Sequence, residues 1–246
     1  MMRIVLAVPD RPFMLLTEQR HALRQISIFR SAAEPTLDRA AALSRWQRHA
    51  EGTIILSYQD ASTDIFFILE GTVRAIIYAP DGKSLLFTDL EKGEVFGEIA
   101  AIDRGPRSAN IEALRPTLVA VMSSADFEHI LREDAEVCVA ALRLLTSRVR
   151  RLSERVYEFR AFAVQNRIHA ELLRLARASG VAQGEVVLSP APTLAEIADR
   201  VSTHREAVSR ELSRLGSLGL IVRDGGALRI NDVARLGDLV REARGE

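Results

Sequence analysis

The chain has 246 residues, enough for one large domain or two of modest size. Apolar residues make up 48% and charged residues 27%, which is typical of a globular protein with a hydrophobic core. The 33 basic and 33 acidic residues cancel, which excludes a globally basic nucleic-acid coater but not a local basic patch. Cys138 is the one cysteine, so an internal disulfide is excluded. No apolar run is long enough for a membrane span or a signal peptide, and we expect a cytoplasmic protein without a membrane partner.

In the first half of the sequence, the residue pattern changes near Gly52 from helix-like to β-rich. Residues 1–20 show no clear pattern and are expected to form an extension, while residues 21–50 are predicted to be helical with a break at Pro35. Asp81-Gly82 lies between two β-rich runs and is a strong hairpin signal. Such short runs, separated by turn residues, predict a sandwich or barrel. They cover residues 53–58, 65–69, 73–78, 85–90, 109–114 and 118–123.

The segment Phe96–Asn110 carries the most chemical information. It reads as a strand end, a turn at Gly97, a short helix over residues 99–102 and a return to a strand. Free backbone N–H groups at a helix start, together with Arg107, favour an anion, and the carboxylate of Glu98 suits ribose hydroxyl groups. The residues alone leave two interpretations open: a pocket for a sugar phosphate, or a Glu98–Arg107 ion pair that braces the turn.

Residues 125–163 contain no glycine or proline and are predicted to form one long helix or two in series. Their apolar residues repeat every seven positions, which is the a/d seam of a coiled coil. This seam favours helix–helix dimerisation over packing within one domain, and Cys138 on it is expected to be a core residue. One row comprises Leu142, Val149, Val156 and Ala163, and the other Cys138, Leu145, Leu152 and Phe159.

The C-terminal region reads as a helix-turn-helix after an amphipathic helix over residues 164–180. Two capping-box patterns, Thr193–Glu196 and Thr203–Glu206, predict helices that start near Leu194 and His204. Residues 218–230 then read as strand, Gly-Gly turn and strand, which is typical of a wing. Arginines at the start of the second helix suit guanine edges, while Glu206 suits either a cytosine contact or the capping box. The candidate DNA-binding residues are Thr203, His204, Arg205, Glu206, Ser209 and Arg210.

Two segments resemble known families. The spacing from Gly97-Glu98 to Pro106-Arg107-Ser108-Ala109 resembles the phosphate-binding cassette of cyclic-nucleotide-binding domains. Residues 194–229 resemble the winged helix of the Crp/Fnr family, which includes the cyclic-AMP receptor protein. The resemblance implies an α+β chain with an N-terminal jelly-roll-like β-roll, a long dimerisation helix and a C-terminal winged helix-turn-helix. The expected boundaries are residues 1–20 for the extension, 21–132 for the β-roll, 133–163 for the dimerisation helix and 164–246 for the DNA-binding domain.

The resemblance also implies a ligand and the residues that hold it. The ligand is expected to be a cyclic nucleotide, cAMP or cGMP, with Glu98 on the ribose and Arg107 on the cyclic phosphate. A Thr-Ser pair that contacts adenine in the cyclic-AMP receptor protein corresponds here to Leu152 and Ser153, which puts the preference for adenine in doubt. No metal or haem is expected. The full set of expected ligand residues is Gly97, Glu98, Ile99, Ala100, Arg107, Ser108, Ala109 and Ser153.

The function implied is a ligand-gated transcriptional regulator that is not an enzyme. Such a protein binds a palindromic, double-stranded operator as a homodimer, and RNA polymerase is an expected partner. One alternative keeps the regulator but gives it a different effector or none. Another alternative is a cyclic-nucleotide sensor that acts on a protein partner instead of DNA.

Overall fold

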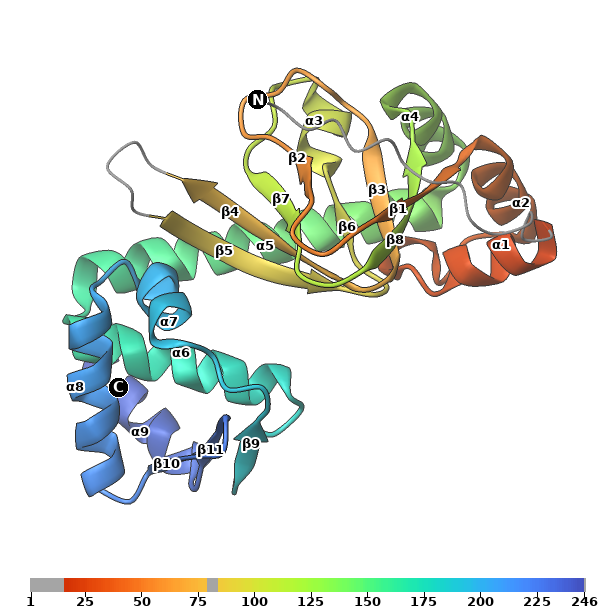
Figure 1. Cartoon of the computed structure of the whole chain (residues 1–246). Coiled ribbons are helices and arrows are strands. Elements are labelled where there is room, and N and C mark those ends of the chain that lie inside the picture. The colour runs from red at the N-terminus through yellow and green to blue at the C-terminus, as the bar shows by residue number, and fades with distance from the viewer. Residues whose placement is uncertain (1–15, 79–83, 246) are drawn as a thin grey trace. The chain divides into compact units, whose positions relative to one another are not determined.

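A computed structural model describes residues 16–78 and 84–245 (Figure 1). Two compact units make up the chain. The N-terminal unit takes Met1–Tyr78 and Phe87–Arg148, and the second unit takes Val149–Glu246 with the segment Ala79–Leu86. The predicted hairpin turn at Asp81-Gly82 and most of the predicted extension lie outside the described residues.

The N-terminal unit contains two four-stranded sheets within its described residues, in the orders β1-β8-β3-β6 and β2-β7-β4-β5. Phe66 and Ile68 of β3 belong to the core shared by both sheets, while Ile65 and Phe67 face a second core formed with helices. This alternation buries both faces of β3 and confirms the predicted sandwich. The strands are β1 (Arg45–His49), β2 (Ile54–Leu56), β3 (Ile65–Glu70), β4 (Thr72–Tyr78), β5 (Ser84–Glu91), β6 (Val95–Phe96), β7 (Asn110–Ala113) and β8 (Thr117–Met122).

Helices cover the outer face of the sheet that contains β3. Residues 45–49 were expected to be helical, and that prediction is wrong: they form β1, which pairs antiparallel with β8 from Arg45–Val121 to His49–Thr117. Sheet pairing therefore overrides the local sequence preference. Pro35 lies in the first turn of α2, where its missing N–H costs nothing, instead of breaking a helix. The elements are α1 (Leu16–Arg24), η1 (Ser27–Phe29), α2 (Glu34–Leu43), α3 (Glu98–Asp103) and α4 (Ser124–Glu133). Thus α1 begins inside the segment expected to be an extension.

The region predicted as one long helix or two is two, α4 and α5 (Ala135–Ala161), separated at Asp134. Most of the predicted seam lies on α5, but Ala163 follows its end and caps the next helix. Several seam residues are exposed in the described structure, and the expected dimerisation through them stays a prediction. Their exposed fractions are 58% for Leu142, 62% for Val149, 48% for Leu152, 67% for Val156 and 36% for Phe159.

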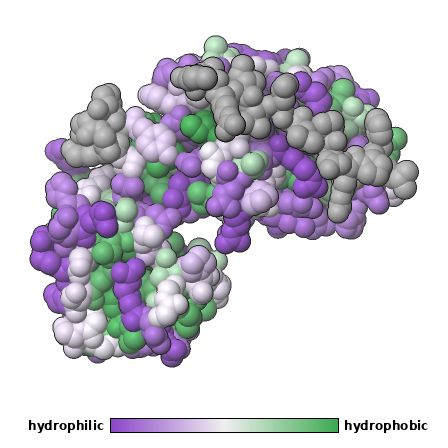
Figure 2. Space-filling view, viewed as in Figure 1, coloured by the Kyte–Doolittle hydropathy of each residue, from purple (hydrophilic) through white to green (hydrophobic). Residues whose placement is uncertain are grey.

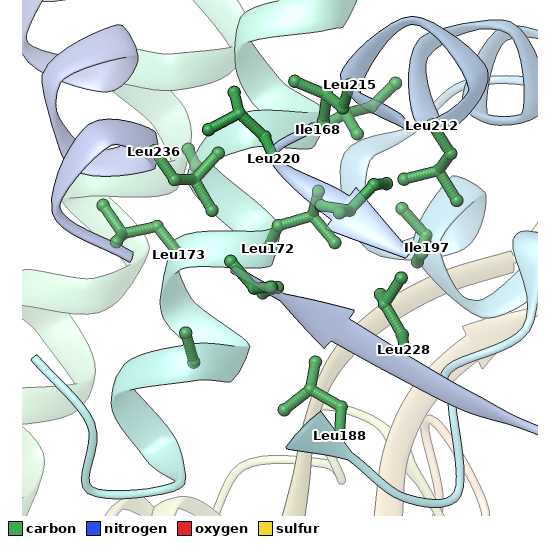
Figure 3. Close-up of a cluster of buried hydrophobic side chains, with 14 of the residues drawn as sticks. Ile168, Leu172, Leu173, Leu188, Ile197, Leu212, Leu215, Leu220, Leu228 and Leu236 are labelled. Atoms are coloured by element: carbon green, nitrogen blue, oxygen red, sulfur yellow. The ribbon is translucent and has the colours of Figure 1, made fainter. Parts of the chain in front are cut away.

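The second unit is a winged helix-turn-helix around its own hydrophobic core, which Figure 3 shows in close-up. Ile168 and Leu172 of α6 meet Leu212 and Leu215 of α8 in this core. Figure 2 shows hydrophobic residues reaching the visible face of this unit between hydrophilic ones. Its elements are α6 (Val164–Ala178), β9 (Val186–Leu188), α7 (Leu194–Val201), α8 (Arg205–Ser217), β10 (Ile221–Asp224), β11 (Ala227–Ile230) and α9 (Val233–Arg244). The predicted wing is confirmed as β10–β11, whereas β9 and α9 were not predicted from the sequence.

One of the two predicted capping boxes forms. Thr193 and Glu196 cap α7 reciprocally, as expected. The second prediction is wrong because α8 begins one residue later, with His204 as its N-cap and no side-chain cap. Thr203 instead ends α7, since its N–H donates to the carbonyl of Ala198 at 3.0 Å.

Candidate functional site

The turn between β6 and α3 is built around Gly97. This residue has φ +78°, a left-handed conformation that favours glycine. A Cβ here would lie 2.7 Å from Nη1 of Arg107 and 2.9 Å from the carbonyl oxygen of Asp64. Glycine therefore lets the strand end, the helix start and Arg107 come together. The first backbone N–H groups of α3, including those of Ile99 and Ala100, have no acceptor within their own helix.

Arg107 is the most unusual side chain of this region, because it is a cation with 2% exposure. Its Nε donates to Oγ of Ser62 at 3.0 Å, Nη1 to the carbonyl of Gly97 at 3.1 Å and Nη2 to the carbonyl of Asp64 at 2.8 Å. Among the described residues, no carboxylate lies within salt-bridge distance of it. Burial lowers the pKa of the guanidinium, and the more distant charges of Asp64, Asp60 and Glu98 oppose that shift. Arg107 thus keeps its charge, with two of its five N–H donors beyond these bonds.

Glu98 is also buried, with 3% exposure. Its partner is Arg148 on α5, whose Nη1 donates to Oε1 of Glu98 and whose Nη2 donates to the carbonyl of Val95 at 2.6 Å. The interpretation of a Glu98–Arg107 ion pair is therefore wrong, since the carboxylate is engaged by a helix far along the chain. Sequence reasoning missed Arg148 as a site residue. Its only signal was its place among the arginines that flank the heptad seam.

The remaining expected ligand residues differ in their exposure. Ile99 is 40% exposed, Ala100 is buried, Ser108 is exposed and Ala109 is half-buried just before β7. The turn therefore brings Gly97 and Arg107 into hydrogen-bond contact, with Glu98 next to Gly97 in the chain and these four residues beside them in the sequence. Ser153 is exposed on the part of α5 that belongs to the second unit, and its role stays a prediction.

The helix-turn-helix is held by a half-buried arginine of α6. Arg167 donates from Nε to the carbonyl of Val201 at 3.1 Å and from Nη2 to that of Ser202 at 3.5 Å, so it fixes the turn between α7 and α8. Ser202 is left-handed, with φ +50°. Burial lowers the pKa of Arg167. Sequence reasoning did not assign a role to this residue.

Helix α8 has one buried and one polar face. Val208, Leu212 and Leu215 enter the core. The face opposite exposes the expected DNA contacts on successive turns, while Thr203 before the helix is half-buried. Gly225 and Gly226, with φ +54° and +85°, form the two-residue turn of the wing. The exposed set is His204, Arg205, Glu206, Ser209 and Arg210.

Comparison with known proteins agrees with both halves of this geometry. Residues 46–134 match the cyclic nucleotide-binding domain, and residues 166–239 match the Crp-like helix-turn-helix domain. The chain belongs to the Crp/Fnr family. Its two matched domains contain the Gly97 turn and helix α8, respectively.

Similar proteins span most of the chain. A CRP-like cAMP-activated global transcriptional regulator of Mycobacterium tuberculosis is 26% identical over 75% of this chain and 83% of its own length. A cAMP-activated global transcriptional regulator of Pasteurella multocida is 28% identical over 72% of this chain and 84% of its own length. The solved structure of the c-di-GMP responsive global regulator of Xanthomonas campestris has a TM-score of 0.67 at 19% identity, over 81% of this chain and 99% of that one. This structural likeness supports the fold.

In residues 16–78 and 84–245, no helix has the length and hydropathy needed to span a membrane. In the same residues, no group of three or more histidine, cysteine, aspartate or glutamate side chains is arranged to hold a metal ion.

Proposed function

We propose that this protein is a transcriptional regulator whose N-terminal unit binds a cyclic nucleotide and whose second unit binds DNA. The observation that carries the proposal is Arg107, a buried guanidinium whose hydrogen-bond partners are neutral. An uncompensated buried cation is costly, and an anionic ligand offsets that cost. The protein acts by binding and not by catalysis, in the cytoplasm where its operator lies.

A cyclic nucleotide has the groups that this site lacks. Its phosphate accepts from Arg107, from the hydroxyl of Ser108 and from the free N–H groups of Ile99 and Ala100. A ribose hydroxyl donates to Glu98 and then shares that carboxylate with Arg148. Ligand binding therefore acts on α5 directly, because Arg148 belongs to that helix. A ligand gates the protein only if it binds one state of this helix better than the other.

The first test is calorimetric titration of the purified protein with cAMP and, separately, with cGMP. We expect micromolar or tighter binding of one of them, which corresponds to about −8 kcal/mol or better. Arg107→Gln should abolish this binding. Arg104→Gln is the matched control, because Arg104 lies in the same segment but is paired on the surface with Glu128. Unchanged affinity of the Arg107 variant would contradict the assigned phosphate site.

A different effector is the second candidate, and Leu152 favours it. This side chain is 48% exposed on α5, where the family resemblance expects a threonine toward the base. A third titration arm with cyclic di-GMP tests it, since a structurally similar regulator is named for that ligand. Binding of cyclic di-GMP alone would replace cAMP and cGMP with this effector. Binding of none of the three would leave the DNA-binding half of the proposal and remove its cyclic-nucleotide half.

We infer further that the protein is a homodimer through α5. The exposed apolar row that includes Leu142, Val149 and Val156 supports this. Val149→Glu should give monomers in sedimentation velocity. Arg150→Glu, at an exposed position beside the row, should leave the dimer intact. A dimer that survives Val149→Glu would place the interface elsewhere.

The exposed face of α8 supports DNA as the partner, because two arginines on adjacent turns suit guanine edges. In a dimer, two such helices read major grooves about 34–36 Å apart, as on a palindromic operator, and RNA polymerase is the expected protein partner. Arg210→Ala should relax selectivity at one base pair of a duplex selected from a random library. An equal loss of affinity on every sequence would make Arg210 a phosphate contact only. An affinity for DNA that does not change with ionic strength would favour the alternative of a sensor that acts on a protein partner.

A further inference from the structure

A polar trio, in which His169 and Glu211 are buried and Arg214 is exposed, connects α6 to α8. His169 of α6 is 2% exposed, and Glu211 of α8 is 7% exposed. Nε2 of His169 lies 2.5 Å from Oε1 of Glu211. Arg214, one turn further along α8, donates from Nη2 to the same oxygen at 2.7 Å and from Nε to Oε2 at 3.0 Å. The His169–Glu211 pair is thus a buried hydrogen-bonded contact beside the hydrophobic core, and Arg214 joins it from the exposed side.

The position of Glu211 links this contact to the exposed face of α8. Glu211 directly follows Arg210, so the two side chains leave α8 at adjacent positions, one into the core and one toward solvent. Hydrophobic contacts are non-directional, whereas a hydrogen bond fixes distance and angle. The bond from His169 therefore sets how α8 is rotated against α6. That rotation determines where Arg205 and Arg210 point.

We propose that His169 is a positioning residue for DNA recognition, which holds the base-reading face of α8 in register through Glu211. The proposal rests on the proposed function, because it requires α8 to read DNA. It differs from a direct contact, since His169 is buried and touches no DNA.

The protonation of His169 makes this role testable. A neutral imidazole with its proton on Nε2 donates to Glu211, and its Nδ1 is buried with no partner among the described atoms. A second proton would place an N–H on Nδ1 with no acceptor. Burial lowers the pKa of His169, and the attraction of Glu211 opposes that shift. The neutral form is therefore the one that holds α8.

Only α8 presents charged groups to this imidazole within the described residues, namely Glu211 and Arg214. The charged groups that α5 and α7 bring to α6 pair with Glu171 and Arg174 instead, and they are Arg155, Glu158 and Arg200. The remaining contacts of α7 and α9 with this core are hydrocarbon. From α7 these are Ile197, Ala198 and Val201, and from α9 they are Val233, Leu236 and Val240. A pH response of the contact in the range where histidine titrates thus belongs to His169.

The experiment compares the full-length wild type with His169→Leu and His169→Gln. The readout is the ratio of affinity for a duplex that the wild type selects from a random library to affinity for a scrambled duplex. His169→Leu should lower this ratio about tenfold, the loss of one misplaced base contact. His169→Gln, whose Nε2 can donate in place of the imidazole, should restore most of it. His129→Leu, an exposed histidine of the N-terminal unit, is the control.

The pH dependence separates positioning from simple loss of folded protein. Because burial lowers the pKa of His169 below its ordinary value of 6.5, the wild-type ratio should fall as the pH drops below 6.5, and that of His169→Gln should stay level. Circular dichroism at each pH shows that both remain folded. The inference about His169 would be overturned if His169→Leu left the affinity ratio unchanged, or if the ratio of His169→Gln also fell with pH. Either result would leave the proposed function standing. A wild type with no sequence preference would overturn the proposed function of α8 and this inference with it.

Discussion

The two units stabilise their buried charges in different ways. In the N-terminal unit, backbone groups form hydrogen bonds with the buried charges. Arg107 donates to two carbonyl groups, and Asp134 accepts from three backbone N–H groups. In the second unit, side chains of opposite charge meet each other. Glu171, with 1% exposure, lies within 3.6 Å of arginines from α5, α6 and α7. These are Arg155, Arg174 and Arg200.

This difference distinguishes a ligand site in the N-terminal unit from a structural charge cluster in the second unit. Opposite charges that pair leave little field around them, whereas a charge met by neutral dipoles still attracts a counterion. The charge cluster around Glu171 therefore serves to join three helices of the second unit. Arg107 remains available to an anionic ligand. Glu98 is the exception in the N-terminal unit, and its pairing with Arg148 is the one that a ligand would have to share.

The largest expected effect comes from breaking the charge cluster. Glu171→Leu removes the buried carboxylate that three arginines share, and the loss of one partner of a buried ion pair costs about 3–5 kcal/mol of unfolding free energy. Urea unfolding followed by circular dichroism should show this loss for the second unit. The fluorescence of Trp46, the one tryptophan of the chain, should report an unchanged transition for the N-terminal unit. Glu154→Gln, at an exposed position of α5, is the control, and an equal loss in both variants would contradict the cluster's role.

The next effect concerns Arg107. A cyclic nucleotide at a hundredfold excess over its Kd should raise the unfolding free energy of the N-terminal unit by about 2.7 kcal/mol. Trp46 fluorescence measures this rise. Arg107→Gln should cancel it, and Arg104→Gln should keep it. A comparable rise in the Arg107 variant would mean that the ligand binds elsewhere, and the contrast between the two units would then lose its functional meaning.

Much of this arrangement could be predicted from local patterns. The Gly97 turn, the short helix after it and the Thr193 capping box depend on residues within a few positions of one another, so the sequence indicates them directly. The β1 strand could not be predicted in this way, because its pairing partner β8 lies about seventy residues along the chain. The same holds for Arg148 and Glu98, which a distance of fifty residues separates. Long-range pairs of this kind have no local signature.

A smaller effect is expected at Asp134, where the N-terminal unit holds a buried negative charge. Burial by itself would raise the pKa of this carboxyl, but hydrogen bonds from Thr36 and from backbone N–H groups, including that of Ala33, lower it below its ordinary value of 3.8. Asp134→Asn should cost about 1 kcal/mol, because a neutral amide oxygen accepts these hydrogen bonds more weakly than a carboxylate does. Because the folded-state pKa is lowered, this stabilisation is present above pH 3.8 and is lost as the pH falls toward the folded-state pKa.

The measurement is the Trp46 unfolding transition from neutral to acidic pH. The wild type should lose the contribution of Asp134 as the pH falls below 3.8, and Asp134→Asn should lack that part of the pH dependence. Asp38→Asn, at a largely exposed position on α2, is the control. Equal pH profiles of the wild type and Asp134→Asn would show that backbone donors do not stabilise this charge.

The smallest expected effect compares two threonines that look alike in sequence. Thr193 accepts from the N–H of Glu196 at 3.1 Å and caps α7, so Thr193→Ala should cost about 1 kcal/mol. Thr203 uses its backbone to end α7, and α8 begins without a side-chain cap, so Thr203→Ala should change the unfolding free energy by less than about 0.5 kcal/mol. Both values come from urea unfolding of the second unit without DNA. If the two variants lost equal stability, the side chain of Thr203 would cap α8 in solution, and the N–H groups at the start of this helix would be stabilised in the same way as those of α7. If only Thr193→Ala lost stability, the start of α8 would depend on Arg167 and on its buried contacts with α6.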